Sequence, residues 1–192
     1  LFSFLPAYML PYKLSVAVAG VMILVWMNLR GVKESVMPLV PIFIVFIVTH
    51  VFFILYAGTT HISSTPQIMT STAGDVSSTT TELGIAGSLF LIMKAYSMGA
   101  GTFTGIEAVS NGIPILREPR VKTARRTMNY MSFSLAFMVG GLMLSYLLFH
   151  VHHIPGKTLN AALFETITSS WGRAGSMLVL VTLLSEALML FV

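Results

Sequence analysis

A run of small and hydroxyl-bearing residues followed by a carboxylate lies inside an apolar segment, between residues 94 and 111. The run reads KAYSMGAGTFTGIEAVSN, and its three glycines fall within seven residues. Each glycine lowers helix propensity by about 1 kcal/mol relative to alanine, and a broken backbone in hydrocarbon leaves N–H and C=O groups unpaired. Transporters place such breaks where half-helices meet at an ion or substrate site. The run therefore predicts a discontinuous membrane helix with a binding site at its break.

The predicted site consists of the backbone at the break and the side chains beside it. The half-helix before the break would end in carbonyl groups, which suit a cation, and the half-helix after it would begin with N–H groups, which suit a carboxylate. The predicted substrate- or ion-binding residues are Gly99, Gly101, Thr102, Phe103, Thr104, Gly105, Glu107 and Asn111. The alternative is a glycine-rich packing seam, which is common between membrane helices.

Glu107 is the titratable residue closest to the predicted break. Thr104 and Glu107 have the spacing T-x-x-E, a capping box for a helix that starts near residue 105. A carboxylate near the membrane midplane is costly and is a functional candidate by default, so we expect Glu107 to bind the substrate or a coupling cation. Two alternatives stay open: Glu107 only caps the restarted helix, or it pairs with a residue on a helix outside this chain.

Three other ionisable residues lie in apolar segments. His50 would carry a proton or, more simply, donate as a neutral imidazole to a backbone carbonyl. Lys94 and Glu107 would be about 20 Å apart along an unbroken helix, so we expect Lys94 to extend to the interface or to pair with an acid elsewhere. Glu186 lies in the last apolar run, too near the end of the chain for its role to be assigned.

The composition indicates a membrane protein. The 192 residues are 55% hydrophobic and 9% charged, whereas a soluble domain has about 25% charged residues. The charges are clustered, which leaves apolar segments that approach or exceed the ~20 residues of a membrane-crossing helix. These segments are about 12–29, 37–58, 83–116 (broken near 99–105), 127–150 and 174–192. The predicted fold class is all-α, with polytopic transmembrane helices in a single domain.

Several classes of function find no support in the sequence. The chain has no cysteine, which excludes disulfides and thiolate metal sites. It has no Walker-type phosphate loop, no HExxH and no nucleophile elbow, so we expect no catalytic residues, no metal and no cofactor, only a coupling H+ or Na+. Because the chain begins at Leu1 and stops at Val192 inside an apolar run, we expect a piece of a longer protein.

The distribution of basic residues predicts the orientation in the membrane. The loops at 30–35 and 117–126 hold most of the lysine and arginine, and residues 59–82 hold none. The positive-inside rule then places the two basic loops in the cytoplasm and the hydrophilic loops at 59–82 and 151–173 outside. Within the second external loop, residues 159–170 are weakly amphipathic and predict a short surface helix. Topology explains the net charge better than nucleic-acid binding does.

Two motifs resemble a known superfamily. Residues 28–35, NLRGVKES, are similar to the N-x-R-G-V-K-x-S pattern between the fourth and fifth helices of amino acid–polyamine–organocation (APC) permeases. The run GTFTGIEAVSN resembles their broken sixth helix, and the following REPRVKTARR is most similar to the branch of KUP-like potassium importers. The resemblance implies a fragment of a LeuT-like inverted-repeat transporter, from the end of helix three to part of helix eight. Its site would lie between the broken first and sixth helices, with residues 99–107 on the sixth.

These observations give an ordered set of functional hypotheses. We expect a secondary active transporter that moves a small amino acid across the plasma or inner membrane by alternating access, coupled to a proton or sodium gradient. The alternative is a proton-coupled potassium importer, and a non-transporting membrane scaffold or sensor is the hypothesis from another class. The expected partners are a small-molecule or ion substrate and the lipid bilayer, without nucleic acid, and a homodimer is left open.

Overall fold

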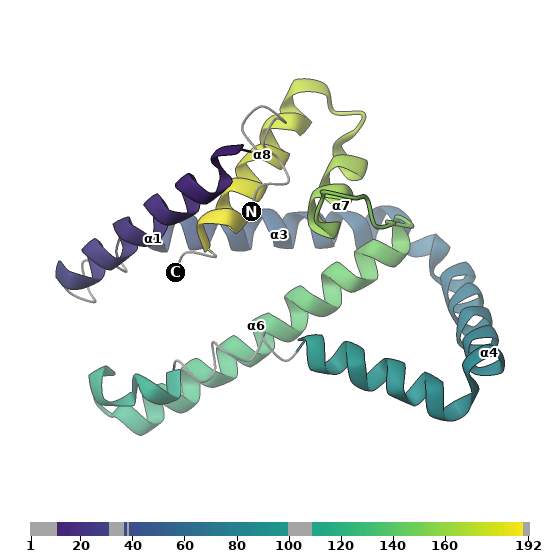
Figure 1. The fold of residues 1–192 in the computed structure, drawn as a ribbon, viewed down its shortest axis with the longest axis horizontal. Coiled ribbons are helices and arrows are strands. Elements are labelled where there is room, and N and C mark those ends of the chain that lie inside the picture. The colour runs from purple at the N-terminus through teal and green to yellow at the C-terminus, as the bar shows by residue number, and fades with distance from the viewer. Residues whose placement is uncertain (1–10, 31–36, 38, 100–108, 190–192) are drawn as a thin grey trace. The chain divides into compact units, whose positions relative to one another are not determined.

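The structure is a computed structural model that describes residues 11–30, 37, 39–99 and 109–189 (Figure 1). Within these ranges the regular elements are helices and no strand occurs. Three helical stretches are long and apolar enough to cross a membrane: Leu39–Gly99, Arg120–Leu148 and Gly172–Met189. The predicted all-α, multi-pass membrane architecture is confirmed at this level.

In chain order, the described helices are α1 (Lys13–Arg30), α3 (Leu39–His61), α4 (Thr65–Gly99), α6 (Arg120–Leu148), α7 (Leu159–Thr168) and α8 (Gly172–Met189), with 3₁₀ turns at Ile62–Ser64 and Ile113–Ile115. Four of them overlap the predicted apolar segments 12–29, 37–58, 127–150 and 174–192. The apolar part of α1, Lys13–Met27, is shorter than the three crossing stretches.

Residues 59–82 are helical, although the sequence predicted a hydrophilic loop. α3 continues to His61, and α4 begins at Thr65 after a single 3₁₀ turn. Hydroxyl groups in this region donate to carbonyl oxygens one turn earlier, as in Thr80 Oγ1 to Val76 O at 2.7 Å and Thr81 Oγ1 to Ser77 O at 2.9 Å. Serine and threonine can therefore stay in a helix by satisfying their hydroxyls within it, and their abundance misled the prediction.

The helical stretch α4 contains a break at Gly84 that the sequence analysis did not predict. Gly84 has φ 68° and ψ 170°, a conformation with positive φ that only glycine adopts at low cost. Helix precedes Leu83, so the segment predicted at 83–116 continues a helical stretch that begins at Thr65. At the other end α4 stops at Gly99, and residues 100–108, where the functional break was predicted, lie outside the described residues.

Most of the basic run at 117–126 belongs to a helix and not to a loop. α6 begins at Arg120, directly after Pro119, and includes four of the five basic side chains of this run. These side chains are largely exposed: Arg120 pairs with Glu118 at 3.0 Å, and Arg126 Nε donates to the Tyr130 hydroxyl at 3.0 Å. The charge remains concentrated at one end of α6, which is the property that the topology prediction uses.

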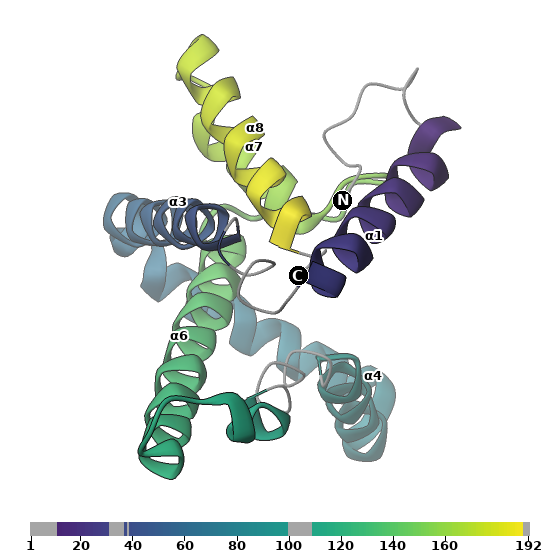
Figure 2. The same ribbon diagram turned by 90° about the vertical axis from the view of Figure 1, so that its left-hand side faces the viewer.

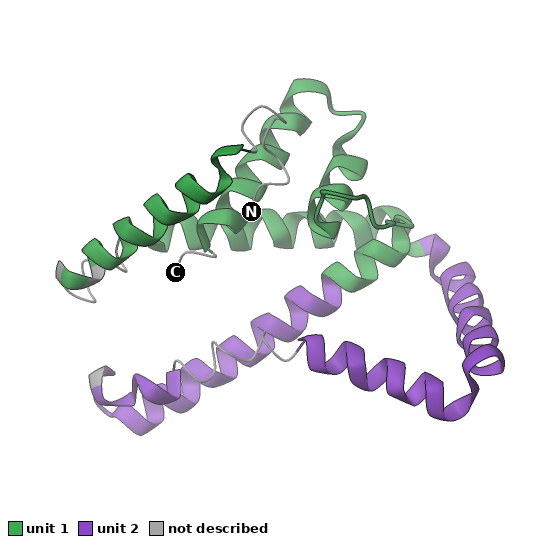
Figure 3. Cartoon of the chain, in the orientation of Figure 1, with its two compact units in different colours: residues 1–62, 142–192 green, residues 63–141 purple. Residues whose placement is uncertain are grey.

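The chain divides into two compact units, residues 1–62 with 142–192 and residues 63–141 (Figure 3). In the first unit α8 packs against both α3 and α7, and α7 lies beside α8 in Figure 2. The centre of the core is a stacked pair of rings, Phe53 of α3 and Phe164 of α7, with centroids 4.2 Å apart. Leu183 of α8 completes this buried cluster.

The short helix α7 is part of the core, contrary to the predicted surface helix. Ala161, Leu163 and Phe164 are completely buried within the first unit. The opposite side of α7 carries the exposed Glu165, whose carboxylate pairs with Lys157 at 2.5 Å. The amphipathic pattern was thus recognised, but its apolar face packs on α3 and α8 and not on a membrane surface.

The start of α8 approaches the end of α7 closely at Gly175. A Cβ added to Gly175 would lie 2.7 Å from the Thr168 carbonyl oxygen and 2.9 Å from the Thr168 Cβ. Both neighbours are backbone or near-backbone atoms, so they cannot swing away as the end of a flexible side chain could. The absence of a side chain at Gly175 therefore allows the start of α8 to lie this close to the end of α7.

We predict that Gly175→Ala lowers the melting temperature of the full-length protein in detergent, since overpacking of this kind costs about 1–3 kcal/mol. The matched control is Gly58→Ala in α3, where an added Cβ meets no atom within 4 Å. The control should melt at the wild-type temperature or slightly above, because alanine is favoured over glycine in a helix by about 0.5–1 kcal/mol. Equal melting temperatures for Gly175→Ala and the wild type would contradict the close approach.

Candidate functional site

The site predicted from the glycine-rich run is only partly within the described residues. Gly99 is the last residue of α4, and Asn111 is exposed just before the 3₁₀ turn at 113–115. The other six predicted residues, Gly101, Thr102, Phe103, Thr104, Gly105 and Glu107, lie outside the described residues. Their binding role stays a prediction.

The described residues assemble a different polar site inside the first unit. We call it the polar cluster: His50 of α3, Tyr146 of α6, Asn160 of α7 and Glu186 of α8. His50 Nε2 lies 2.8 Å from Glu186 Oε1. The Asn160 amide donates to the same carboxylate oxygen, and the Tyr146 hydroxyl donates to the Asn160 amide oxygen. Side chains from four helices are thereby joined in one hydrogen-bonded chain.

His50 lies at the centre of α3, where aromatic rings enclose it. Its Nδ1 is 2.8 Å from the Phe46 carbonyl oxygen, one turn earlier in the helix. The Phe46 ring lies against the imidazole at 4.2 Å between centroids, and the Phe164 ring meets it edge-on at 5.3 Å. The residue is completely buried. The simpler sequence hypothesis, a bond from His50 to a backbone carbonyl, fits this geometry, but the second ring nitrogen has an ionisable partner as well.

The start of α7 directs Asn160 towards Glu186. Thr158 caps the helix, its Oγ1 accepting from the Ala161 backbone N–H at 3.2 Å, so Asn160 falls in the first turn. From this position the Asn160 amide reaches the Glu186 carboxylate.

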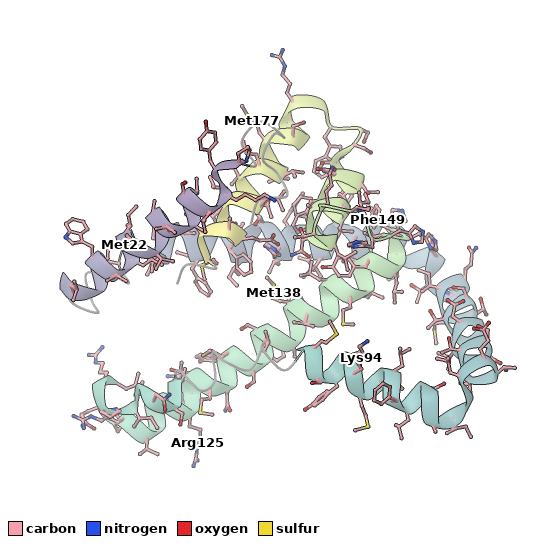
Figure 4. All side chains as sticks on the ribbon, viewed as in Figure 1. Met22, Lys94, Arg125, Met138, Phe149 and Met177 are labelled. Carbon is pink, nitrogen blue, oxygen red and sulfur yellow. The ribbon has the colours of Figure 1, made fainter. Side chains whose placement is uncertain are left out.

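The end of α6 positions Tyr146 at the edge of the cluster. The Val151 N–H donates to the Tyr146 carbonyl at 2.9 Å, and the His150 N–H donates to the Leu147 carbonyl at 3.2 Å. Together they form a Schellman-type helix end, with His150 at φ 48° in the position usually taken by glycine. The Phe149 ring packs against the His61 ring of α3 at 4.1 Å, which anchors this end of α6 to α3 (Figure 4).

The hydroxyl groups around the cluster are satisfied within their own helices. Thr49 donates to the Val45 carbonyl, and Thr182 donates to the Leu178 carbonyl, at 2.9 and 2.8 Å. In contrast, the side chains of the polar cluster form hydrogen bonds to side chains of other helices. The Glu186 side chain is 18% exposed, so the carboxylate is the accessible end of the pair and the imidazole is the enclosed end.

The sequence singled out two members of the cluster separately and missed the other two. His50 and Glu186 were each noted as ionisable residues in apolar segments, but nothing in their spacing indicated that they meet. The available signal was their complementary chemistry, since intramembrane ionisable residues usually pair with one another. Asn160 and Tyr146 had no such signal. Lys94, the other noted residue, lies exposed on the second half of α4 (Figure 4).

The described residues contain no group of three or more His, Asp or Glu side chains that could hold a metal ion. The chemistry open to the polar cluster is therefore hydrogen bonding, charge pairing and the exchange of a proton between an imidazole and a carboxylate.

The sequence is similar to a bacterial protein. Over 134 residues, or 68% of this chain, it is 32% identical to the Potassium transporter KimA of Bacillus subtilis (strain 168). The aligned part is 21% of that protein, so the chain spans about a fifth of its length. No protein-family model matches the chain, and no solved structure matches it significantly. A transporter role, the APC superfamily and the LeuT-like repeat remain expectations.

A double-mutant cycle should detect strong coupling between His50 and Glu186. We predict that His50→Leu and Glu186→Leu each lower the stability of the full-length protein, because each leaves a buried polar partner unpaired. The double variant should lose less than the sum, with a coupling energy of about 0.5–3 kcal/mol, as found for residues in direct contact. Unfolding would be followed by intrinsic fluorescence in detergent.

The control cycle uses Lys157→Gln and Glu165→Gln, an ion pair whose side chains are 35% and 44% exposed. Exposed pairs contribute about 0.2–1 kcal/mol, so the coupling measured there should be smaller. Additive effects of the His50 and Glu186 substitutions would show that the two side chains do not interact in the folded protein.

Proposed function

We propose that this chain is part of a proton-coupled potassium transporter of the plasma or inner membrane that works by alternating access. The observation that carries the proposal is the 32% identity over 134 residues to a protein named as a potassium transporter. This similarity favours potassium over the small amino acid that the sequence analysis placed first. The membrane-spanning helices and their intramembrane ionisable side chains are what such a transporter requires.

The glycine-rich run offers suitable chemistry for potassium. Proteins bind this ion with carbonyl oxygens that replace its hydration shell, and a half-helix that ends in hydrocarbon presents such oxygens. We assign the cation site to the carbonyl groups of residues 99–105 and to the Glu107 carboxylate, with Thr102 and Thr104 as further oxygen ligands. This assignment is supported by the residue types and by the resemblance to the broken sixth helix of APC permeases.

A small amino acid is the second candidate substrate. The observation in its favour is the same break, because the half-helix after it begins with N–H groups that suit a carboxylate ligand. The two substrates differ in the groups that they need: potassium uses carbonyl and carboxylate oxygens, whereas an amino acid uses N–H groups for its carboxylate and oxygens for its ammonium group.

The test is uptake by the full-length protein in proteoliposomes under an imposed pH gradient. Radioactive rubidium, as a potassium substitute, is compared with a mixture of labelled amino acids. We predict rubidium uptake by the wild type and its reduction by roughly tenfold or more in Glu107→Gln, which corresponds to a loss of about 1.4 kcal/mol of cation binding. The control is Glu82→Gln, an exposed carboxylate on α4, which should transport as the wild type does.

Each of the other outcomes would reject a different part of this proposal. Uptake of amino acids without rubidium would reject the potassium assignment, and uptake driven only by a sodium gradient would reject proton coupling. Rubidium uptake that survives Glu107→Gln would reduce Glu107 to a helix cap. A wild-type protein that transports none of these solutes would favour a scaffold or sensor.

A further inference from the structure

We propose that His50 and Glu186 together bind one exchangeable proton, and that this site couples proton movement to transport. The proposal rests on the proposed function, because it assigns the proton of a proton-coupled transporter to α3 and α8. It separates the proton site from the cation site at Glu107.

The backbone fixes where one hydrogen of the imidazole lies. The Phe46 carbonyl oxygen can only accept a hydrogen bond, and His50 Nδ1 lies 2.8 Å from it. Nδ1 must therefore carry a hydrogen and donate it. The protonation of the other ring nitrogen, Nε2, is then decided by Glu186 alone.

The contact between the two side chains requires one further proton. At 2.8 Å between His50 Nε2 and Glu186 Oε1, two unprotonated atoms would direct lone pairs at each other. A single proton removes this repulsion, either on Nε2 as an imidazolium beside a carboxylate or on Glu186 as a carboxylic acid beside a neutral imidazole. The pair has zero net charge in both forms. Loss of the proton leaves one buried negative charge, which is unfavourable in a membrane.

The neighbours of the His50–Glu186 pair leave a bound proton to neutralise the Glu186 charge. The Phe46 and Phe164 rings lie against His50, and the uncharged Asn160 donates to Glu186. From α6, Tyr146 reaches the pair only through Asn160. The other titratable groups on the packed helices are engaged elsewhere: Tyr56 packs on Trp171, His61 on Phe149, and Glu165 pairs with Lys157, while Arg173 lies at the opposite end of α8 from Glu186.

The position of the pair links its protonation to helix packing. It joins α3 to α8 directly, and Asn160 joins both to α7. A proton taken from hydronium through the partly exposed Glu186 leaves a water molecule behind and closes this contact. Release of the proton places two lone pairs in opposition, and the repulsion favours separation of α3 from α8. A two-state contact of this kind is what alternating access needs, because the proton then binds one state better than the other.

The experiment uses the full-length protein in proteoliposomes, with the variant Glu186→Gln. The amide has nearly the size of the carboxylic acid and cannot release a proton. We expect rubidium accumulation driven by a pH gradient to fall by roughly tenfold or more, within the range typical of coupling between two sites. Rubidium–potassium exchange at equal pH on both sides is measured as well and should lose less than accumulation does, because exchange requires no net proton movement.

The matched control is Glu165→Gln, which neutralises a carboxylate on α7 whose side chain is 44% exposed. It should leave both activities unchanged. Accumulation that survives Glu186→Gln would overturn the proposal, because the proton would then bind elsewhere.

A second measurement decides the matter if Glu186→Gln fails to fold or loses both activities. Nitrogen-15 and carbon-13 spectra of labelled wild-type protein report the protonation of His50 and Glu186 directly, with His50 assigned by comparison with His50→Gln. We expect His50 Nδ1 to stay protonated throughout, while the pair gains one proton as the pH is lowered. No change in protonation over the pH range of transport would overturn the proposal.

This measurement also separates the inference from the proposed function. It needs no transported solute, so a protein that fails to move rubidium can still show the shared proton. Conversely, rubidium uptake driven by protons together with an unchanging His50–Glu186 pair would retain the proposed function and reject this site.

Discussion

The first unit depends on the rule that polar groups inside a membrane must find their partners within the protein. Backbone groups meet this rule by forming helices, and the hydroxyls of Thr49 and Thr182 meet it by bonding to their own helices. His50 and Glu186 cannot do so alone, because a charge in hydrocarbon needs a countercharge. Their 2.8 Å contact therefore specifies which helices must be neighbours: α3, which carries the imidazole, and α8, which carries the carboxylate.

The apolar packing around this contact determines its geometry. The Phe164 ring stacks on Phe53 and meets the imidazole edge-on, and α7 packs its buried face on α8 and α3, which also pack directly on each other. Gly175 allows α8 to leave the end of α7 without a clash. The polar cluster and the apolar core are thus not separate features, since Phe164 belongs to the core and also encloses His50. Dispersion contacts hold the aromatic rings in place, and the hydrogen bonds favour one relative position of the helices that carry them.

The helical, membrane-spanning character of the chain could be predicted because it depends on local composition and length. The errors arose where one residue or a distant contact decides the structure. Residues 59–82 are helical because hydroxyls can bond within a helix, and Gly84 breaks α4 through one positive φ angle. The apolar face of α7 was visible in the sequence, but whether it packs on lipid or on protein depends on helices far away in the chain. The contact between His50 and Glu186 joins residues of α3 and α8 that are 136 positions apart in the sequence, and no spacing rule relates them.

We propose different roles for two carboxylates: Glu107 binds the cation, and Glu186 binds the proton together with His50. The central structural claim is that His50 and Glu186 are direct partners in the full-length protein. A cryo-electron-microscopy structure of the full-length protein in a lipid nanodisc, at a resolution that shows side chains, tests this claim directly. We predict that His50 Nε2 and Glu186 Oε1 lie within hydrogen-bonding distance, with Asn160 bonded to the same carboxylate. Side chains that face separate partners on other helices would contradict it.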